Sequence, residues 1–252
     1  MKKLLALLFA LIGLAKGEVI RVLAASDLQY VLREIAELYS KEYPEDKVDL
    51  LFGSSGKGYA QIRAGAPYHI FFSADMKYVE KLYREGYAIK EPKPYAIGRL
   101  VVWTRKDSGF EPSKFPEVLF DKRVRRIAIA NWSHAPYGKA AKEMLESYGV
   151  FHRVKDKLVL GENIAQTTSY IRSGAAEIGL IALSLAKSPE LEKLGKYWLV
   201  PEDKHERLLQ GYTITREGQK VISAKRFYEF IASPQARRVL LKYGFMLPGE
   251  GP

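Results

Sequence analysis

The chain alternates short apolar runs with stretches whose apolar residues recur at helical spacing. Residues 19–24 form a largely apolar run, and in the following residues 28–39 apolar side chains recur every three or four positions. The same alternation repeats at residues 48–52 and 70–73, each of which leads into another helical pattern. A strand and helix order of this kind predicts an α/β fold of mostly parallel sheets with helices on both faces.

A second set of elements follows a proline-bearing connector at residues 90–94. Its predicted strands are 99–103, 127–130, 158–160 and 178–183, and its predicted helices are 140–148 and 164–172. Strands at 198–200 and 212–215 are predicted to return to the first set, and helices at 224–232 and 234–242 close the chain.

The first 17 residues have the pattern of a secretory signal peptide. Basic residues come first, residues 4–15 are apolar, and small residues at Ala15 and Gly17 offer a cleavage site. The apolar run is shorter than the roughly 20 residues that a membrane-spanning helix needs. We therefore expect cleavage near Gly17 and a soluble mature chain of about 235 residues, which is enough for two modest lobes.

The absence of cysteine and the positive charge limit the possible functions. Without cysteine an exported chain has no disulfide, no Cys-based zinc site and no lipid-modified N-terminal cysteine. We infer that an outer membrane retains the mature protein, which is therefore periplasmic.

The net charge is positive. Loss of Lys2, Lys3 and Lys16 with the signal peptide lowers the formal net charge from +11 to +8. The basic residues are scattered along helices, which is typical of a solvated surface, and export argues against a nucleic-acid partner.

Three predicted strands run directly into small or hydroxyl-bearing turns that begin helices. Ser26 precedes Gln29 and Asn163 precedes Gln166 at the spacing of a capping box, and the third turn is Gly-Ser-Ser-Gly at 53–56. Each turn presents unpaired backbone N–H groups and the positive end of a helix dipole. At the carboxyl ends of strands in an open α/β sheet, such helix ends together form an anion site.

The competing interpretation is that each Ser or Asn only caps its own helix. The glycines around Ser54 and Ser55 favour a ligand site, because backbone without a Cβ atom can approach a ligand closely. A site made of hydroxyl and N–H donors suits a fully ionised tetrahedral anion. A protonated phosphate would place a donor against donors, at a cost of roughly 1–3 kcal/mol for each such contact. Charge alone does not separate sulfate, molybdate and tungstate.

Several motifs, in the same order along the chain, resemble those of the periplasmic molybdate-binding proteins of bacterial ABC importers. They are Val-Leu-Ala-Ala-Ser-Asp-Leu at 22–28, Phe-Gly-Ser-Ser-Gly at 52–56, Gly-Ala-Pro at 65–67 with Ile-Phe-Phe-Ser-Ala-Asp at 70–75, Ala-Pro-Tyr-Gly at 135–138 and Gly-Glu-Asn at 161–163. Ser-Pro-Gln-Ala at 233–236 with Tyr-Gly-Phe at 243–245 is similar to the end of that family. The resemblance spans nearly the whole mature chain.

This resemblance implies a type II periplasmic-binding-protein fold, with two lobes joined by a hinge and molybdate or tungstate held between them. Lobe I would comprise residues 18–96 and 206–252, and lobe II residues 97–205. The protein would have no cofactor, no free cation site and no enzymatic activity. We expect a monomer whose partner is the permease and ATPase complex of an importer.

Carried over by motif, the ligand contacts would be the side chains of Ser26 and Ser55 and the backbone N–H groups of Tyr137 and Ile164. Residues expected around these contacts are Asp27, Ser54, Gly56, Asn163 and Ala182. We expect the Asp27 carboxylate to point away from the ligand, because it would repel an anion. Some family members have a tyrosine where this chain has Ala182, so one side-chain donor is missing here.

Two histidines, His69 and His134, directly precede motifs of the resemblance. His69 replaces a frequent acidic residue of the family and receives no role, whereas His134 lies near the predicted cleft, where a histidine can sense ligand or pH. Two other functions are possible. The first is that the protein binds another tetrahedral oxyanion, sulfate or phosphate. Ser54 and Lys57 match the Ser-x-x-Lys pattern of penicillin-interacting enzymes, but the partner motifs Ser-Asp-Asn and Lys-Thr-Gly are absent from the sequence.

Overall fold

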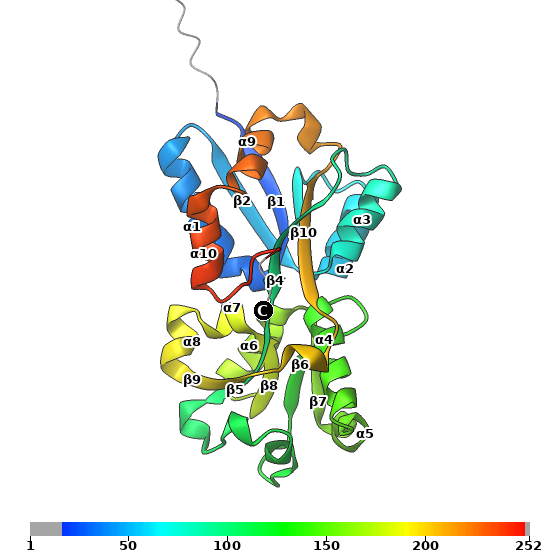
Figure 1. The fold of residues 1–252 in the computed structure, drawn as a ribbon, viewed down its shortest axis with the longest axis vertical. Helices are drawn as coiled ribbons and strands as arrows, with labels where there is room; N and C mark the ends of the chain where they lie inside the picture. The colour runs from blue at the N-terminus through cyan, green and yellow to red at the C-terminus, as the bar shows by residue number, and fades with distance from the viewer. Residues whose placement is uncertain (1–16, 250–252) are drawn as a thin grey trace, which may run out of the picture.

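The computed structural model describes residues 17–249, which form two lobes stacked along the long axis of the molecule (Figure 1). Residues 1–16, on which most of the signal-peptide prediction falls, lie outside the described residues. Within residues 17–249, no helix is both long enough and apolar enough to cross a membrane.

The first lobe is built on a five-stranded sheet with the order β2-β1-β3-β10-β4. Its parallel strands are β1 (Val19–Ala25), β2 (Lys47–Gly53) and β3 (Ile70–Ser73). Strand β10 (Leu208–Ile214) runs antiparallel to β3, and β4 (Lys93–Gly98) runs antiparallel to β10. Segments from both ends of the chain therefore share one sheet.

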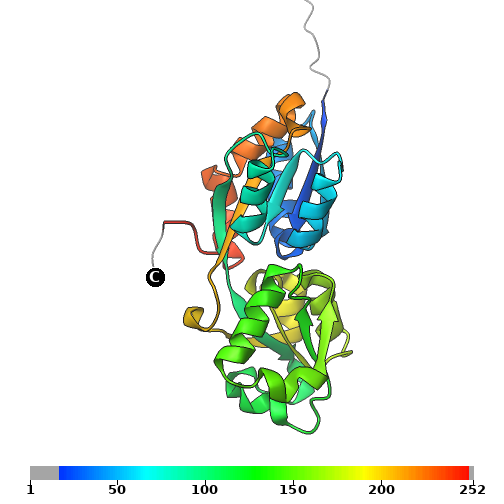
Figure 2. The same cartoon turned by 90° about the vertical axis from the view of Figure 1, so that its right-hand side faces the viewer.

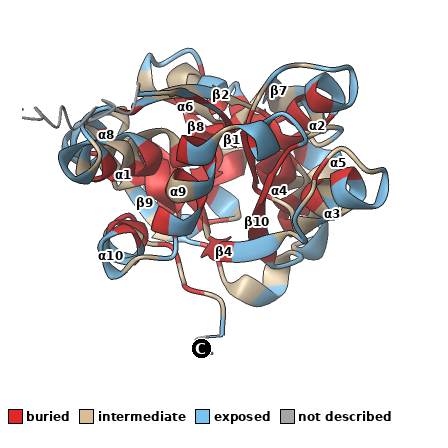
Figure 3. Cartoon of the chain, turned by 90° about the horizontal axis from the view of Figure 1, so that it is seen from above, coloured by how far each residue is buried: buried red, intermediate tan, exposed pale blue. Residues whose placement is uncertain are grey.

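Helices cover both faces of this sheet because alternate strand residues point to opposite sides. Val22 packs with α1 (Gln29–Glu42), α9 (Ile222–Phe230) and α10 (Pro234–Lys242). Its neighbour Leu23 packs on the opposite face, with α2 (Ser55–Arg63) and α3 (Met76–Arg84). Figure 3 shows the buried residues gathered on the strands and on the inner sides of these helices.

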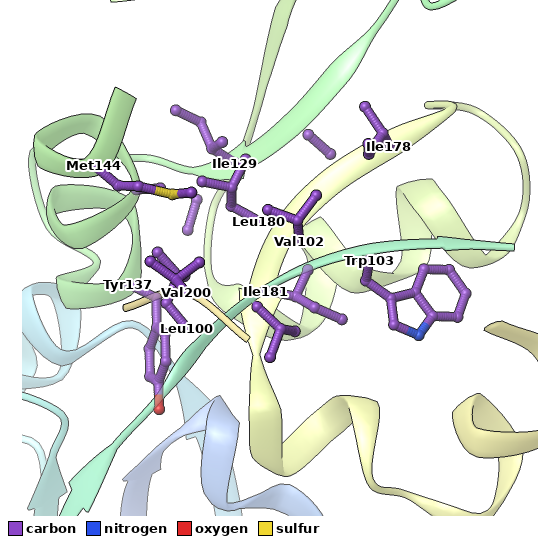
Figure 4. Close-up of a cluster of buried hydrophobic side chains, with 14 of the residues drawn as sticks. Leu100, Val102, Trp103, Ile129, Tyr137, Met144, Ile178, Leu180, Ile181 and Val200 are labelled. Atoms are coloured by element: carbon purple, nitrogen blue, oxygen red, sulfur yellow. The ribbon is translucent and has the colours of Figure 1, made fainter. Parts of the chain in front are cut away.

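The second lobe repeats this arrangement with the strand order β7-β6-β8-β5-β9. Strands β7 (Leu158–Gly161), β6 (Ile127–Ala130) and β8 (Ile178–Ala182) are parallel, whereas β5 (Leu100–Arg105) and β9 (Gly195–Leu199) are paired antiparallel. The helices are α4 (Pro136–Ser147), α5 (Phe151–Val154), α6 (Ile164–Arg172), α7 (Leu183–Ala186) and α8 (Pro189–Leu194). Figure 4 shows the core that they enclose, with Trp103, Ile129 and Met144 among its members.

The two-lobed α/β fold is confirmed, but two details of the sequence prediction were wrong. Each sheet is mostly parallel, as predicted, and only the strand that enters from the other lobe, β10 in the first sheet and β5 in the second, runs against the other strands. The strand predicted at 198–200 does not return to the first lobe, since β9 pairs with β5 in the second sheet. The segment treated as a connector leads into β4 from Lys93, where Pro94 is tolerated at the edge of the sheet.

Two segments connect the lobes, and they run side by side (Figure 2). Only Arg99 separates β4 from β5, and residues 200–207 lead from β9 back to β10. The N–H group of Val200 donates to Leu100 O at 3.0 Å, and Arg99 Nη2 donates to Val200 O at 3.3 Å. These bonds hold the two crossings together as a double-stranded hinge.

Candidate functional site

A small cavity lies between the lobes, at the carboxyl ends of β1, β2 and β3. Its lining residues are Ala25, Ser26, Asp27, Gly53, Ser54, Ser55, Ala74, Ala135, Pro136, Tyr137 and Ile164. The void is about 200 Å³, including its open side. All four residues predicted to contact a ligand, Ser26, Ser55, Tyr137 and Ile164, lie around this one cavity.

Three helices begin at the cavity wall. Ser54 caps α2 by accepting from Lys57 N at 3.4 Å, and Asn163 caps α6 by accepting from Gln166 N at 2.9 Å, as predicted for Asn163. Helix α4 begins with Pro136 and has no side-chain cap. The first-turn N–H groups of all three helices lack an acceptor within their own helix, so their positive ends converge on one space.

The two serine hydroxyls are held differently. Ser26 does not cap α1 as predicted, because residues Ser26–Leu28 form a 3-10 turn and α1 begins after it. Instead Ser26 Oγ donates to Asn163 Oδ1 at 3.2 Å and accepts from Ala165 N at 3.1 Å, both in the second lobe. Ser55 Oγ accepts from Ala74 N at 2.9 Å, which leaves its O–H group free to donate into the cavity.

Asp27 lies at the cavity wall with only 1% of its surface exposed. Its Oδ2 atom accepts from Tyr137 OH at 2.9 Å and from Gln210 Nε2 at 2.8 Å. Burial raises the pKa of Asp27 to about 7, although the hydrogen bonds from Gln210 and Tyr137 and the backbone N–H groups of Asp27 and Leu28 act in the opposite direction. The carboxyl group is thus part of a buried polar cluster that joins the lobes.

Sequence reasoning missed two members of this cluster, Gln210 on β10 and Tyr95 on β4. Tyr95 OH donates to Gln210 Oε1 at 2.6 Å, which turns the amide NH₂ group toward Asp27. Tyr137 reaches the cluster from α4, and Figure 4 shows its ring extending from the second-lobe core toward the first lobe. No local motif marks Gln210 or Tyr95, because only the sheet pairing of distant segments brings them to Asp27.

Comparison with known proteins identifies the family. Residues 20–246 match the family model described as bacterial extracellular solute-binding protein. The chain belongs to this family of solute-binding proteins. It is 33% identical over 235 residues to the molybdate-binding protein ModA of Rhodobacter capsulatus, covering 92% of this chain and 89% of that protein.

Solved structures agree with this assignment. The periplasmic molybdate-binding protein of Azotobacter vinelandii superposes with a TM-score of 0.84 at 32% identity, covering 91% of this chain and 99% of that one. The sulfate-binding protein SubI of Mycobacterium tuberculosis H37Rv has a TM-score of 0.76 at 13% identity, with 92% of this chain and 88% of that chain covered. The second likeness concerns the fold alone.

At the mouth of the cleft, further contacts join the lobes of this solute-binding protein. Gly56 N donates to His134 O at 2.8 Å, and His134 Nδ1 lies 3.0 Å from Ser54 Oγ. Burial and the nearby Lys57 ammonium lower the pKa of His134, so the ring is neutral near pH 7. Lys57 forms an ion pair with Glu162 across the same opening. The lobes are therefore in a closed arrangement.

Ala182, His69 and Lys57 do not line the cavity. Ala182 is fully buried at the end of β8 and does not line the cavity, and His69 accepts from Arg21 N at 3.0 Å away from it. Lys57 of the Ser-x-x-Lys pattern is paired with Glu162, and the relatives named above are binding proteins. Among residues 17–249, no group of three or more His, Asp or Glu side chains could hold a metal cation.

Proposed function

We propose that this protein captures molybdate or tungstate between its lobes and delivers it to an ABC importer in the membrane. The observation that carries the proposal is the convergence of three helix N-termini and two serine hydroxyls on one cavity. Such a set of neutral donors binds a fully ionised tetrahedral anion without a counterion. The similarity to two molybdate-binding proteins at 32–33% identity supports this choice of anion.

In this proposal, the side chains of Ser26 and Ser55 and the N–H groups of Tyr137 and Ile164 donate to the oxygens of the anion. The Ser26 hydroxyl proton, which is donated to Asn163 Oδ1 in this structure, turns to the anion when the anion binds. The anion binds one lobe first, and rotation about the double-stranded hinge brings the donors of the other lobe onto it. Contacts such as Ser26 Oγ with Ala165 N then close the cavity. Closure excludes water, which strengthens each hydrogen bond to the charged ligand and slows release.

The proposal includes a periplasmic, monomeric mature protein and a permease and ATPase complex as its partner. The predicted signal peptide and the names of the relatives support the location. Both lobes expose surface around the cleft mouth, so an importer that contacts both at once can distinguish the closed form from the open one.

A thermal-shift panel with molybdate, tungstate, sulfate and phosphate tests the proposal on the mature chain. A ligand present at 100 times its Kd stabilises the folded state by ~2.7 kcal/mol, so molybdate or tungstate should raise Tm clearly. Phosphate, which carries a proton near neutral pH, should give no shift at the same concentration. A shift with sulfate alone would reassign the ligand, and no shift with molybdate or tungstate would refute the proposal.

A further inference from the structure

The Asp27 carboxyl group is the only carboxyl group among the residues that line the cavity. Its two oxygens have different surroundings. Oδ2 accepts the two hydrogen bonds from Tyr137 and Gln210, whereas Oδ1 is buried and has no hydrogen-bond partner among the described residues. A buried polar atom without a partner is costly, so this unsatisfied oxygen on a residue that lines the cavity requires an explanation.

The hydrogen-bond cluster determines which oxygen of a neutral Asp27 carries the proton. Tyr95 donates to Gln210 Oε1, and this fixes the Gln210 amide with its NH₂ group toward Oδ2. Tyr137 OH accepts from the same NH₂ group and therefore donates its own proton to Oδ2. Because Oδ2 already accepts two donors, the acid proton belongs on Oδ1, where it makes Asp27 a hydrogen-bond donor.

The ionisable groups that face Asp27 offer it no positive charge. Tyr137 from α4 and Tyr95 from β4 are buried, and burial raises the pKa of each well above 10, so both stay neutral. From α7, Ser184 Oγ donates to the main-chain oxygen of Asp27 at 2.7 Å. No cationic side chain pairs with this carboxyl group among residues 17–249. An ionised Asp27 would therefore be a negative charge without a cationic partner at the wall of an anion site.

We propose that Asp27 binds the oxyanion as a neutral carboxylic acid, with the proton on Oδ1 donated in a hydrogen bond to one oxygen of the ligand. This inference rests on the proposed function and extends it. It replaces the expectation that Asp27 points away from the ligand, because a neutral acid does not repel an anion. The cavity then presents only donors to the anion. Where Asp27 is ionised before binding, the complex forms from the carboxylate, the oxyanion and one proton taken from solvent.

This arrangement makes affinity depend on pH in a defined direction. Burial already raises the pKa of Asp27 to about 7, and a neighbouring dianion raises it further by repulsion. Below this pKa the free protein already carries the proton, so affinity does not change with pH. Above it, each bound anion requires one proton, and affinity falls by about tenfold per pH unit.

Calorimetry of molybdate and tungstate binding across neutral to mildly alkaline pH tests the inference. Both anions are fully ionised over this range, so their own titration contributes nothing. We expect the affinity of the wild-type protein to fall by about tenfold for each pH unit above about pH 7. At pH 8, titrations in two buffers of different ionisation enthalpy should reveal uptake of about one proton per anion, because Asp27 is mostly ionised there before binding.

Asp27→Asn is the matching variant, because its amide oxygen can accept from Tyr137 and Gln210 while its NH₂ group takes the place of the Oδ1 proton. We expect its affinity to be independent of pH over this range and to exceed that of the wild type at the alkaline end. Asp49→Asn on β2 removes one carboxyl charge outside the cavity and should follow the wild-type pH dependence.

The outcomes separate this inference from the proposed function. Binding without pH dependence and without proton uptake would overturn the role of Asp27 and leave molybdate or tungstate capture intact. The same pH dependence in Asp27→Asn as in the wild type would assign the proton to another group and also overturn it. No binding of either anion at any pH would refute the proposed function, and the inference with it. Proton uptake is measured on the wild type, so the test stands even if the variant folds poorly.

Discussion

At the scale of single residues, Ser26 and Ser55 bring hydroxyl groups to the cavity from the ends of different strands. Ser55 Oγ already accepts from Ala74 N, so its O–H group can donate only to a further acceptor. Ser26 Oγ in the closed arrangement bonds to the first turn of α6 and thereby also joins the lobes. The two serines should therefore both contribute to ligand affinity.

We predict that Ser26→Ala and Ser55→Ala each weaken oxyanion binding by about 1–3 kcal/mol, as for loss of a hydrogen bond to a charged group. Calorimetric Kd values measure the change. Ser113→Ala, which alters an exposed hydroxyl on the second lobe, serves as the control and should bind normally. Unchanged affinity in both cavity variants would place the binding site elsewhere.

The residue scale also marks a limit of prediction from sequence. The capping spacing at Asn163 correctly predicted a local bond, because a cap and its helix are neighbours in the chain. The same spacing at Ser26 gave a wrong prediction, because Ser26 forms a hydrogen bond to Asn163 of the other lobe and does not cap its own helix. Gln210 and Tyr95 gave no signal, since their roles depend on a buried carboxyl group that is distant in sequence.

At the scale of elements, the first turn of α2 fits closely against the second lobe. Gly56 N donates to His134 O, and a Cβ atom added at Gly56 would lie 2.8 Å from both His134 Cβ and His134 O. Real Cβ contacts are not this short, so any side chain at position 56 must push the lobes apart. Glycine is therefore needed here for close approach and not for an unusual backbone angle.

We predict that Gly56→Ala hinders closure and weakens ligand binding while the ligand-free protein remains stable. The expected loss of affinity is at least tenfold, which corresponds to about 1.4 kcal/mol. Small-angle scattering with saturating ligand should show a more extended particle than the wild type. Gln61→Ala changes an exposed position on the same helix and should close normally. Wild-type affinity and wild-type compaction in Gly56→Ala would show that this contact does not limit closure.

The boundaries of helices and strands could be predicted where the residues that define them are close together in the sequence. Helix α6 at Ile164–Arg172 and strand β3 at Ile70–Ser73 have the predicted bounds, because caps and apolar periodicity define them within a few residues. Strand β4 was missed and β9 was assigned to the wrong lobe, because edge and crossing strands depend on pairing partners far along the chain. The helix starts correctly predicted residues that line one cavity, whereas the buried cluster was missed because its members are distant in sequence.

At the scale of the whole molecule, the positive net charge and the neutral groups of the cavity act on different steps of anion binding. Residues 17–252 carry a formal net charge of +8, which attracts an anion from a distance. In the proposed complex, the cavity holds the anion with hydroxyl and N–H dipoles. The Lys57–Glu162 ion pair at its mouth is partly exposed. Long-range attraction is screened by salt, with a Debye length of ~10 Å at 0.1 M, whereas contacts in a closed cavity are screened much less.

We predict that added salt slows association of the oxyanion and leaves its dissociation rate nearly unchanged. Stopped-flow measurement of intrinsic fluorescence at low and high concentrations of a non-binding salt provides both rates. A neutral osmolyte at matched viscosity controls for slower diffusion. If salt acted mainly on the dissociation rate, direct ion pairing would dominate and the dipole account of binding would be wrong.

The order of synthesis has a consequence for when this protein can bind its ligand. The second sheet comes from the continuous stretch between β5 and β9, so all of its strands are made before the first sheet is complete. The first sheet waits for β10, which lies between β3 and β4 and carries Gln210 to the buried cluster. A chain that has emerged only as far as β9 therefore has all the strands of one lobe and no cavity, and the cavity forms only after residues 208–252 are released.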